Sequence, residues 1–108
     1  MMTYSVIVTD EAKENLRCYY RYAAIYAPEP ALRWLARFEA ALATLAVNPQ
    51  RCPHAPENDR VTYEVREFLF GRRRSAFRAL FTITSDEVRI LHVRRAAMDW
   101  ANPEDLQG

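Results

Sequence analysis

Arginine is the residue type with the clearest chemical potential in this chain, because it is concentrated in one region. Residues 60–95 contain nine arginines and four acidic residues, a balance of +5, whereas residues 1–59 carry six basic and seven acidic residues, a balance of −1. Fourteen of the fifteen basic residues are Arg. A guanidinium can bind a phosphate or a carboxylate through two parallel hydrogen bonds. Residues 60–95 therefore indicate a polyanionic ligand or an acidic partner segment.

Several side chains in and just after this region are candidates for binding or catalysis. The candidates for binding a nucleic acid or another target are Arg72, Arg73, Arg74, Arg94 and Trp100. The run of three arginines is either a solvated turn or part of a binding patch. His92 lies in an apolar stretch, which is more typical of a hydrogen-bonded core histidine than of a catalytic base, although both interpretations stay open.

Other kinds of functional site are excluded or disfavoured by the sequence. Only two glycines are present, so the chain has no glycine-rich phosphate loop. Cys52 and His54 are too few for a zinc site, and Cys18 lies far from Cys52 without a CxxC spacing. We therefore expect reduced thiols, no metal and no cofactor. Without a secretory signal or an apolar run of about 18 residues, the chain is predicted to be soluble and cytoplasmic, with no membrane contact.

The N-terminal half is predicted to form a strand and two helices. Residues 4–8 are a short β-branched run typical of a strand. Apolar residues then recur at three- and four-residue steps in two stretches, separated by Pro28 and Pro30. The first helix begins near Thr9, and the second stops at Asn48 and Pro49. This pattern predicts an antiparallel helical hairpin.

The C-terminal half is predicted to form three antiparallel strands. Residues 49–60 contain three prolines and read as a loop, and strands follow at 61–70, 75–84 and 87–94. The order strand, helix, helix, then three strands predicts a single α+β domain over residues 1–108. In it the helical hairpin packs on one face of a small, mainly antiparallel sheet.

This architecture predicts where the candidate side chains lie. Arg78 alternates with the apolar residues of its strand, so we expect it on the face that the helices leave uncovered, where Arg66 joins it if the register allows. Glu64 and Glu67 are expected to compensate the adjacent arginines rather than to form an acid–base pair. The tyrosines of the first helix are expected to fill space between helix and sheet; these are Tyr19, Tyr20, Tyr22 and Tyr26.

Short motifs also occur in a characteristic order along the chain. They are Tyr4–Val6, Thr9–Ala12 with Leu16, Ala31 and Trp34, Leu45 to Pro49, Val65–Phe68, Gly71, Phe77–Phe81 and Val88–Val93. In this order and spacing they resemble the RelE/ParE family of toxins, and the resemblance covers nearly the whole chain. It implies a growth-inhibiting toxin of a type II toxin–antitoxin module, of the plasmid stabilisation type, held inactive in a hetero-oligomer by a cognate antitoxin.

Two mechanisms divide the family that the chain resembles. RelE-like members cleave mRNA on the ribosome, whereas ParE-like members block DNA gyrase. For a nuclease, the resemblance implies that Arg66 and Arg78 hold the scissile phosphate, with His92 and Arg95 as further catalytic candidates.

The sequence departs from the nuclease pattern near its end. Arg95 and Met98 stand where many relatives have a His and an Arg, and no C-terminal Tyr is present, although Trp100 could stack on a base. The comparatively long hairpin is more similar to the ParE side. Gyrase inhibition is thus the preferred interpretation, with an mRNA endoribonuclease and a non-toxic nucleic-acid-binding module as alternatives. Whether the protein is an enzyme stays open.

Overall fold

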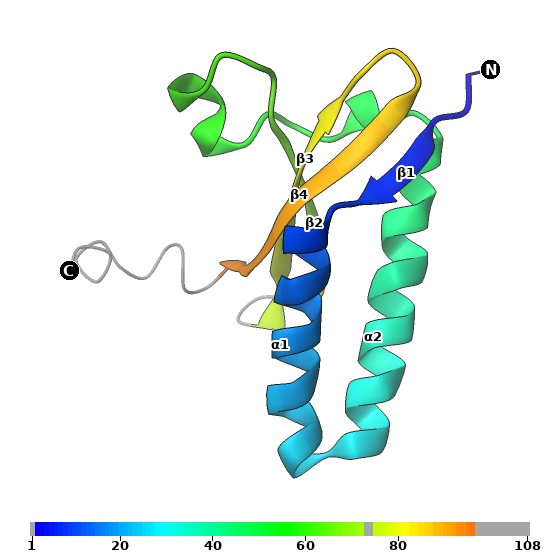
Figure 1. Ribbon diagram of the computed structural model, residues 1–108, viewed down its shortest axis with the longest axis vertical. Helices are drawn as coiled ribbons and strands as arrows, with labels where there is room; N and C mark the ends of the chain where they lie inside the picture. The colour runs from blue at the N-terminus through cyan, green and yellow to red at the C-terminus, as the bar shows by residue number, and fades with distance from the viewer. Residues whose placement is uncertain (1, 73–74, 97–108) are drawn as a thin grey trace.

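The chain folds into two long helices packed on a four-stranded sheet (Figure 1). The computed structural model describes residues 2–72 and 75–96. The elements are β1 (Ser5–Val8), α1 (Asp10–Tyr26), α2 (Pro28–Ala43), the 3-10 turns η1 (Thr44–Ala46), η2 (Pro49–Arg51) and η3 (Pro56–Arg60), then β2 (Arg66–Phe70), β3 (Phe77–Ile83) and β4 (Glu87–Arg95). The predicted α+β class and element order are confirmed. No helix within the described residues is long and apolar enough to cross a membrane.

The helical hairpin is defined by its caps. The Thr9 hydroxyl accepts a hydrogen bond from the backbone N–H of Ala12 at 3.3 Å and donates one to the carbonyl of Ile90 at 2.7 Å. The same side chain therefore starts α1 and ties it to β4. Ala27 alone separates the helices, and Pro28 opens α2, where a missing N–H costs little. As a result, the two helices run side by side for their whole length (Figure 1).

The sheet has the strand order β1-β4-β3-β2. β1 pairs in parallel with β4, whereas β4, β3 and β2 pair antiparallel to one another. Gly71, with a φ of 97°, forms the turn after β2, where a Cβ atom would lie 3.0 Å from the carbonyl oxygen of Ser75. The register shifts at one point, where Leu80 opposes His92 but Phe81 opposes Ile90. This bulge leaves Leu91 as an extra residue in β4.

The main core lies between the hairpin and one face of the sheet. Phe38 is fully buried and stacks on Phe70 with ring centroids 4.5 Å apart. Its neighbours in the core include Leu42, Phe81 and Ile90, which are also buried. Each such side chain contributes roughly 1.5–3 kcal/mol through removal of apolar surface from water. This core fixes the hairpin across the sheet.

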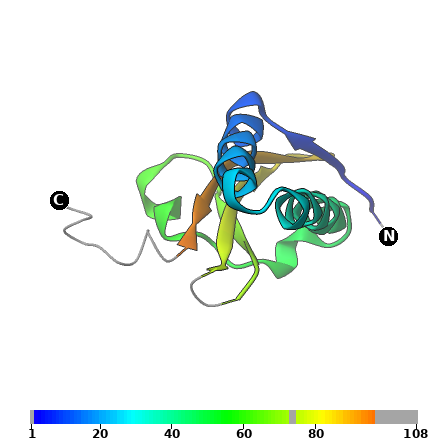
Figure 2. The same cartoon turned by 90° about the horizontal axis from the view of Figure 1, so that it is seen from below.

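The second face of the sheet is not open, which corrects the expectation of an uncovered face. The segment from Pro49 to Val65 crosses it, and Figure 2 shows η3 and the hairpin on opposite sides of β3 and β4. Ala55, Val65 and Leu80 form a small buried cluster beneath the segment. The Asn58 side chain accepts the Val65 N–H at 2.8 Å, so the chain still turns at Val65. For this reason the strand predicted from residue 61 begins only at Arg66.

Candidate functional site

Arg78 is buried on the second face and is held by two carboxylates. Its Nε donates to Glu67 Oε1 at 2.9 Å, and its Nη1 and Nη2 donate to the two Glu57 oxygens at 3.1 and 2.7 Å. Only 7% of the Arg78 side chain is exposed. The hydrogen bonds from Arg78 hold the pKa of Glu57 below its usual 4.5. The expectation that Arg78 faces solvent or a partner is therefore wrong, because η3 carries Glu57 over it.

Arg66 lies on the opposite side of the sheet from Arg78. Arg66 opposes Phe81 in the register, whereas Leu69 opposes Arg78, so the two arginines fall in opposite phases of the strand alternation. The Arg66 Nη1 donates to the carbonyl of Cys52 at 2.6 Å, and Nη2 donates to Glu64 at 3.0 Å. The structure thus does not bring the two arginines together, and each one instead anchors the segment that precedes β2.

The two neighbouring glutamates have the compensating role expected from the sequence. Glu67 pairs with Arg78, and Glu64 pairs with Arg66. Glu64 also contacts His54 Nε2 at 2.7 Å. The hydrogen bond with His54, together with the Arg66 charge, lowers the pKa of Glu64. Within the described part of the chain, no group of three or more metal-ligating side chains comes together.

His92 lies beside the bulge of β4 and is not a core residue, so the favoured interpretation is wrong. A third of its side chain, 33%, is exposed, and Nδ1 lies 3.6 Å from a carboxylate oxygen of Glu11 in the first turn of α1. Arg66 and Arg78 lie on opposite faces of the sheet, so they do not come together beside this imidazole. The described residues therefore do not assemble the predicted phosphate clamp and base.

The remaining basic candidates gather at one end of the sheet. Phe70, Phe77 and Arg95 are successive partners across β2, β3 and β4, and Arg72 follows in the turn after β2. Arg94 and Arg72 are exposed, and neither forms an ion pair with a described residue. The sequence candidates Arg73, Arg74 and Trp100 lie outside the described residues. This end of the sheet therefore carries the accessible guanidinium groups among the described sequence candidates.

A hollow of about 260 Å³, called here the aromatic pocket, opens at the same end. It lies between the hairpin and β3–β4, and its lining residues include Tyr19, Tyr22, Ala23, Trp34, Phe77 and Arg95. Tyr19 packs against Phe77 with ring centroids 5.0 Å apart, as the sequence predicts. Tyr22 and Tyr26 instead are 66% and 75% exposed, so the prediction that they fill space under the helix is wrong.

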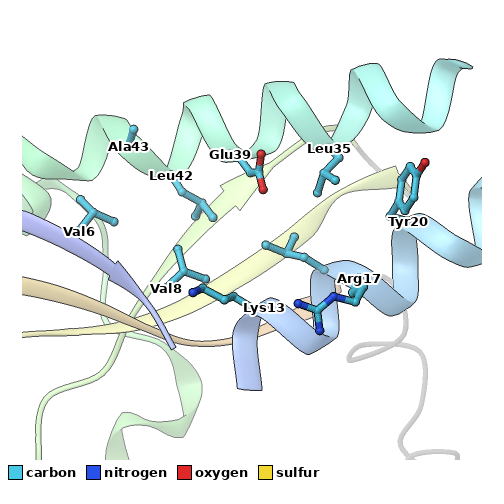
Figure 3. A pocket seen from close by; sticks show the side chains of 10 residues that line it. Val6, Val8, Lys13, Arg17, Tyr20, Leu35, Glu39, Leu42 and Ala43 are labelled. Carbon is cyan, nitrogen blue, oxygen red and sulfur yellow. The ribbon is translucent and has the colours of Figure 1, made fainter. Parts of the chain in front are cut away.

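A second hollow, called here the hairpin groove, lies between β1, α1 and α2 and measures about 370 Å³ (Figure 3). Its apolar residues include Val6, Val8, Leu16, Leu35 and Leu42. Lys13 and Arg17 stand on the α1 wall and Glu39 on the α2 wall. An apolar floor between charged walls is suited to binding an amphipathic segment rather than to covalent chemistry.

Comparison with known proteins assigns the family. A sequence model described as the ParE toxin of the type II toxin–antitoxin system parDE matches residues 6–100. The chain belongs to the ParE toxin family. This match confirms the resemblance to RelE/ParE toxins. It also narrows the family from RelE/ParE toxins in general, which include nucleases, to the ParE toxins.

The fold of this ParE family member is also found in a solved structure, described as the chromosomal ParDE TA system from P. aeruginosa. The two chains are 23% identical, and the match covers 86% of this chain and 96% of the other with a TM-score of 0.70. At this identity the likeness establishes the fold. None of the curated proteins compared with the chain is similar to it.

Sequence reasoning missed two features of this ParE family member. One is Glu57, the carboxylate that covers Arg78, because it lies in a proline-rich stretch without periodicity. The other is the aromatic pocket, although Arg95 was a candidate for a different role. Tyr19 and Tyr22 at three-residue spacing, together with Trp34, offered the available signal for the pocket.

Proposed function

We propose that this ParE family member inhibits DNA gyrase by binding it, and that a cognate antitoxin neutralises it in the cytoplasm. No chemical step by the toxin itself is part of this mechanism. Gyrase inhibition is the preferred interpretation of the sequence, and the positions of Arg66 and Arg78 support it. In this mechanism the accessible surfaces of the protein, rather than a catalytic centre, carry the biological activity.

The separation of Arg66 and Arg78 carries the proposal. An mRNA nuclease of the RelE type is expected to need both guanidinium groups on one scissile phosphate, within a few ångströms of each other. Here the two side chains leave opposite faces of the sheet. Arg78 is enclosed by Glu57 and Glu67, and Arg66 binds two backbone carbonyls and Glu64. To bind a phosphate, either side chain would have to break contacts that hold the fold together.

The apolar surface of the hairpin supports a binding mechanism. Four large apolar side chains at its tip are more than half exposed: Tyr22, Ile25, Tyr26 and Leu32. The rings of Tyr22 and Tyr26 lie 5.8 Å apart in an edge-on arrangement. Exposed apolar patches of this kind mark interaction surfaces in proteins that are otherwise polar outside. A toxin that acts by association needs such a surface, whereas a small nuclease site does not.

Purified gyrase provides the direct test. Relaxed plasmid, gyrase and ATP are incubated with increasing toxin, and the supercoiled product is quantified by gel electrophoresis. We expect supercoiling to fall in proportion to toxin, and to return when the product of the neighbouring antitoxin gene is added. Unaltered supercoiling at a large excess of folded toxin would contradict the proposal.

Expression in a bacterium distinguishes the alternatives. Pulse labelling after induction is expected to show that DNA synthesis stops before protein synthesis. A first arrest in protein synthesis, with cleaved mRNA, would instead identify a ribosome-dependent nuclease. Normal growth with folded toxin present would identify a non-toxic member of the fold.

A further inference from the structure

The aromatic pocket has the size of one large side chain. Its walls hold Trp34 and Phe77, whose ring centroids lie 5.1 Å apart, and Tyr19 packs edge-on against Phe77. The volume of about 260 Å³ exceeds that of a phenylalanine or leucine side chain and is far below that of a folded domain. A single aromatic or aliphatic anchor can therefore enter it.

Arg95 gives this apolar pocket an unused positive charge. Its guanidinium lies 5.9 Å from the centre of the Phe77 ring. Its Nε is buried and has no hydrogen-bond partner among the described residues, and no described carboxylate pairs with the side chain. The Arg95 side chain as a whole is only partly buried and lines the pocket, so a carboxylate that enters the pocket can pair with the accessible part of its guanidinium. Low-dielectric aromatic walls strengthen that interaction.

The surroundings of the pocket favour a peptide over a nucleotide. Tyr22 belongs both to the pocket and to the exposed apolar tip of the hairpin, so the apolar surface is continuous from one to the other. Apart from Arg95, the polar side-chain groups among the described lining residues are the hydroxyls of Tyr19, Tyr22 and Ser75 and the indole N–H of Trp34. Recognition of a base edge needs paired donors and acceptors, whereas an apolar side chain beside a carboxylate needs only these walls and this cation.

We propose that the aromatic pocket binds an acidic segment of the antitoxin, which inserts one aromatic or large aliphatic side chain and places a neighbouring carboxylate on Arg95. The source of the segment rests on the function proposed above, whereas its chemistry comes from the pocket. Arg72, accessible at the same end of the sheet, adds to the attraction for further acidic residues of the segment.

A synthetic peptide tests the chemistry of the pocket without any need for toxicity. The probe is a capped hexapeptide with a central Phe-Leu pair between aspartates, and binding is followed by the fluorescence of Trp34 in a Trp100→Phe background. We expect saturable binding of this peptide. The same peptide with asparagines, and another with serines in place of Phe-Leu, are expected to bind at least about tenfold more weakly. Equal binding of the asparagine peptide would overturn the proposal.

Two substitutions locate the binding. Arg95→Gln removes the cation, and Ala23→Leu fills the pocket, so each is expected to weaken binding of the acidic peptide by about tenfold. Arg94→Gln is the matched control, because Arg94 lies opposite Arg78 in the β3–β4 register and does not line the pocket. Its effect on binding is expected to stay below about twofold. Melting temperatures establish that each variant is folded. Undiminished binding by both pocket variants would overturn the proposal.

The antitoxin itself tests the source of the segment. The protein encoded beside the toxin gene is titrated against wild-type and Arg95→Gln toxin, and the acidic peptide is added as a competitor. Weaker binding by the variant and competition by the peptide are expected. Equal binding would overturn the assignment to the antitoxin while leaving the toxin–antitoxin pairing intact. Failure of this protein to bind wild-type toxin at all would overturn the assignment and contradict the proposed function, whatever the peptide result.

Discussion

Two arginines one strand apart, Arg78 on β3 and Arg95 on β4, have opposite environments. Arg78 is enclosed by two glutamates, one of them carried over the sheet by η3. Arg95 lies against an aromatic ring with an unpartnered Nε at the edge of a pocket. This difference shows that the arginines of this region fall into two groups, one that holds the fold together and one that is accessible to a partner. Residue type alone does not separate them, because the division depends on which face each side chain takes.

Removal of Arg78 is expected to have the largest effect on this comparison. Arg78→Ala leaves Glu67, whose side chain is only 19% exposed, without its cation, and it also empties the space beneath η3. Breaking such a buried pair should lower the free energy of unfolding by about 3 kcal/mol. Urea denaturation followed by circular dichroism measures the loss.

The neighbouring arginine provides the control for this loss. Arg94→Ala removes an exposed guanidinium from the same face and should change the free energy of unfolding by no more than about 0.5 kcal/mol. Equal stability of the Arg78→Ala variant and wild type would show that the pair does not hold the fold. With the expected loss, inactivity of Arg78→Ala cannot be taken as a sign of catalysis.

Neutralising Glu57 should change how stability depends on pH. Its pKa is lowered from 4.5 in the folded protein by the hydrogen bonds from Arg78, so the ion pair stabilises the fold above about pH 5 and is lost as the pH falls through the lowered pKa. Glu57→Gln should therefore be less stable than wild type near pH 7, and the gap should close on acidification. Asp59→Asn changes an exposed residue in the same turn, and this variant is expected to be as stable as wild type at every pH. A gap that stays constant down to pH 3 would argue against the assignment.

Thiol labelling reports whether η3 holds its segment closed. Cys52 is buried and Cys18 is exposed, and burial raises the pKa of the Cys52 thiol. An aromatic disulfide reagent should label Cys18 quickly, and Cys18→Ser should leave a protein that reacts at least about tenfold more slowly. Adding Glu57→Gln to Cys18→Ser is expected to speed the labelling of Cys52. Fast labelling of Cys52 in the single variant would mean that the segment opens freely.

The smallest effect is expected at Arg95. Arg95→Gln removes a guanidinium that no described carboxylate compensates, so the free energy of unfolding should change by less than about 0.5 kcal/mol. Denaturation of this variant beside Arg78→Ala measures the contrast directly. Comparable losses at the two positions would remove the distinction between structural and accessible arginines.

Local periodicity carried the sequence prediction as far as the elements and the main core. Phe38 and Leu42 recur at helical spacing and are buried in the core, and the glycine at the turn before β3 is where the pattern placed it. Placement of the arginines needed information that periodicity lacks. The β2–β3 register separates Arg66 from Arg78, and Glu57 reaches Arg78 across 21 residues of sequence.

The pairing of β1 with β4 has a consequence for how the toxin is made. The strand nearest the N-terminus has its partner at Glu87–Ile90, close to the end of the described chain. Until the ribosome has released that stretch, β1 has no strand to pair with and the hairpin lacks Val88 and Ile90 to pack upon. The four-stranded sheet and its core therefore form only after residues 87–90 have left the ribosome. The aromatic pocket, which needs Phe77 and Arg95, likewise forms only after β4 has been made.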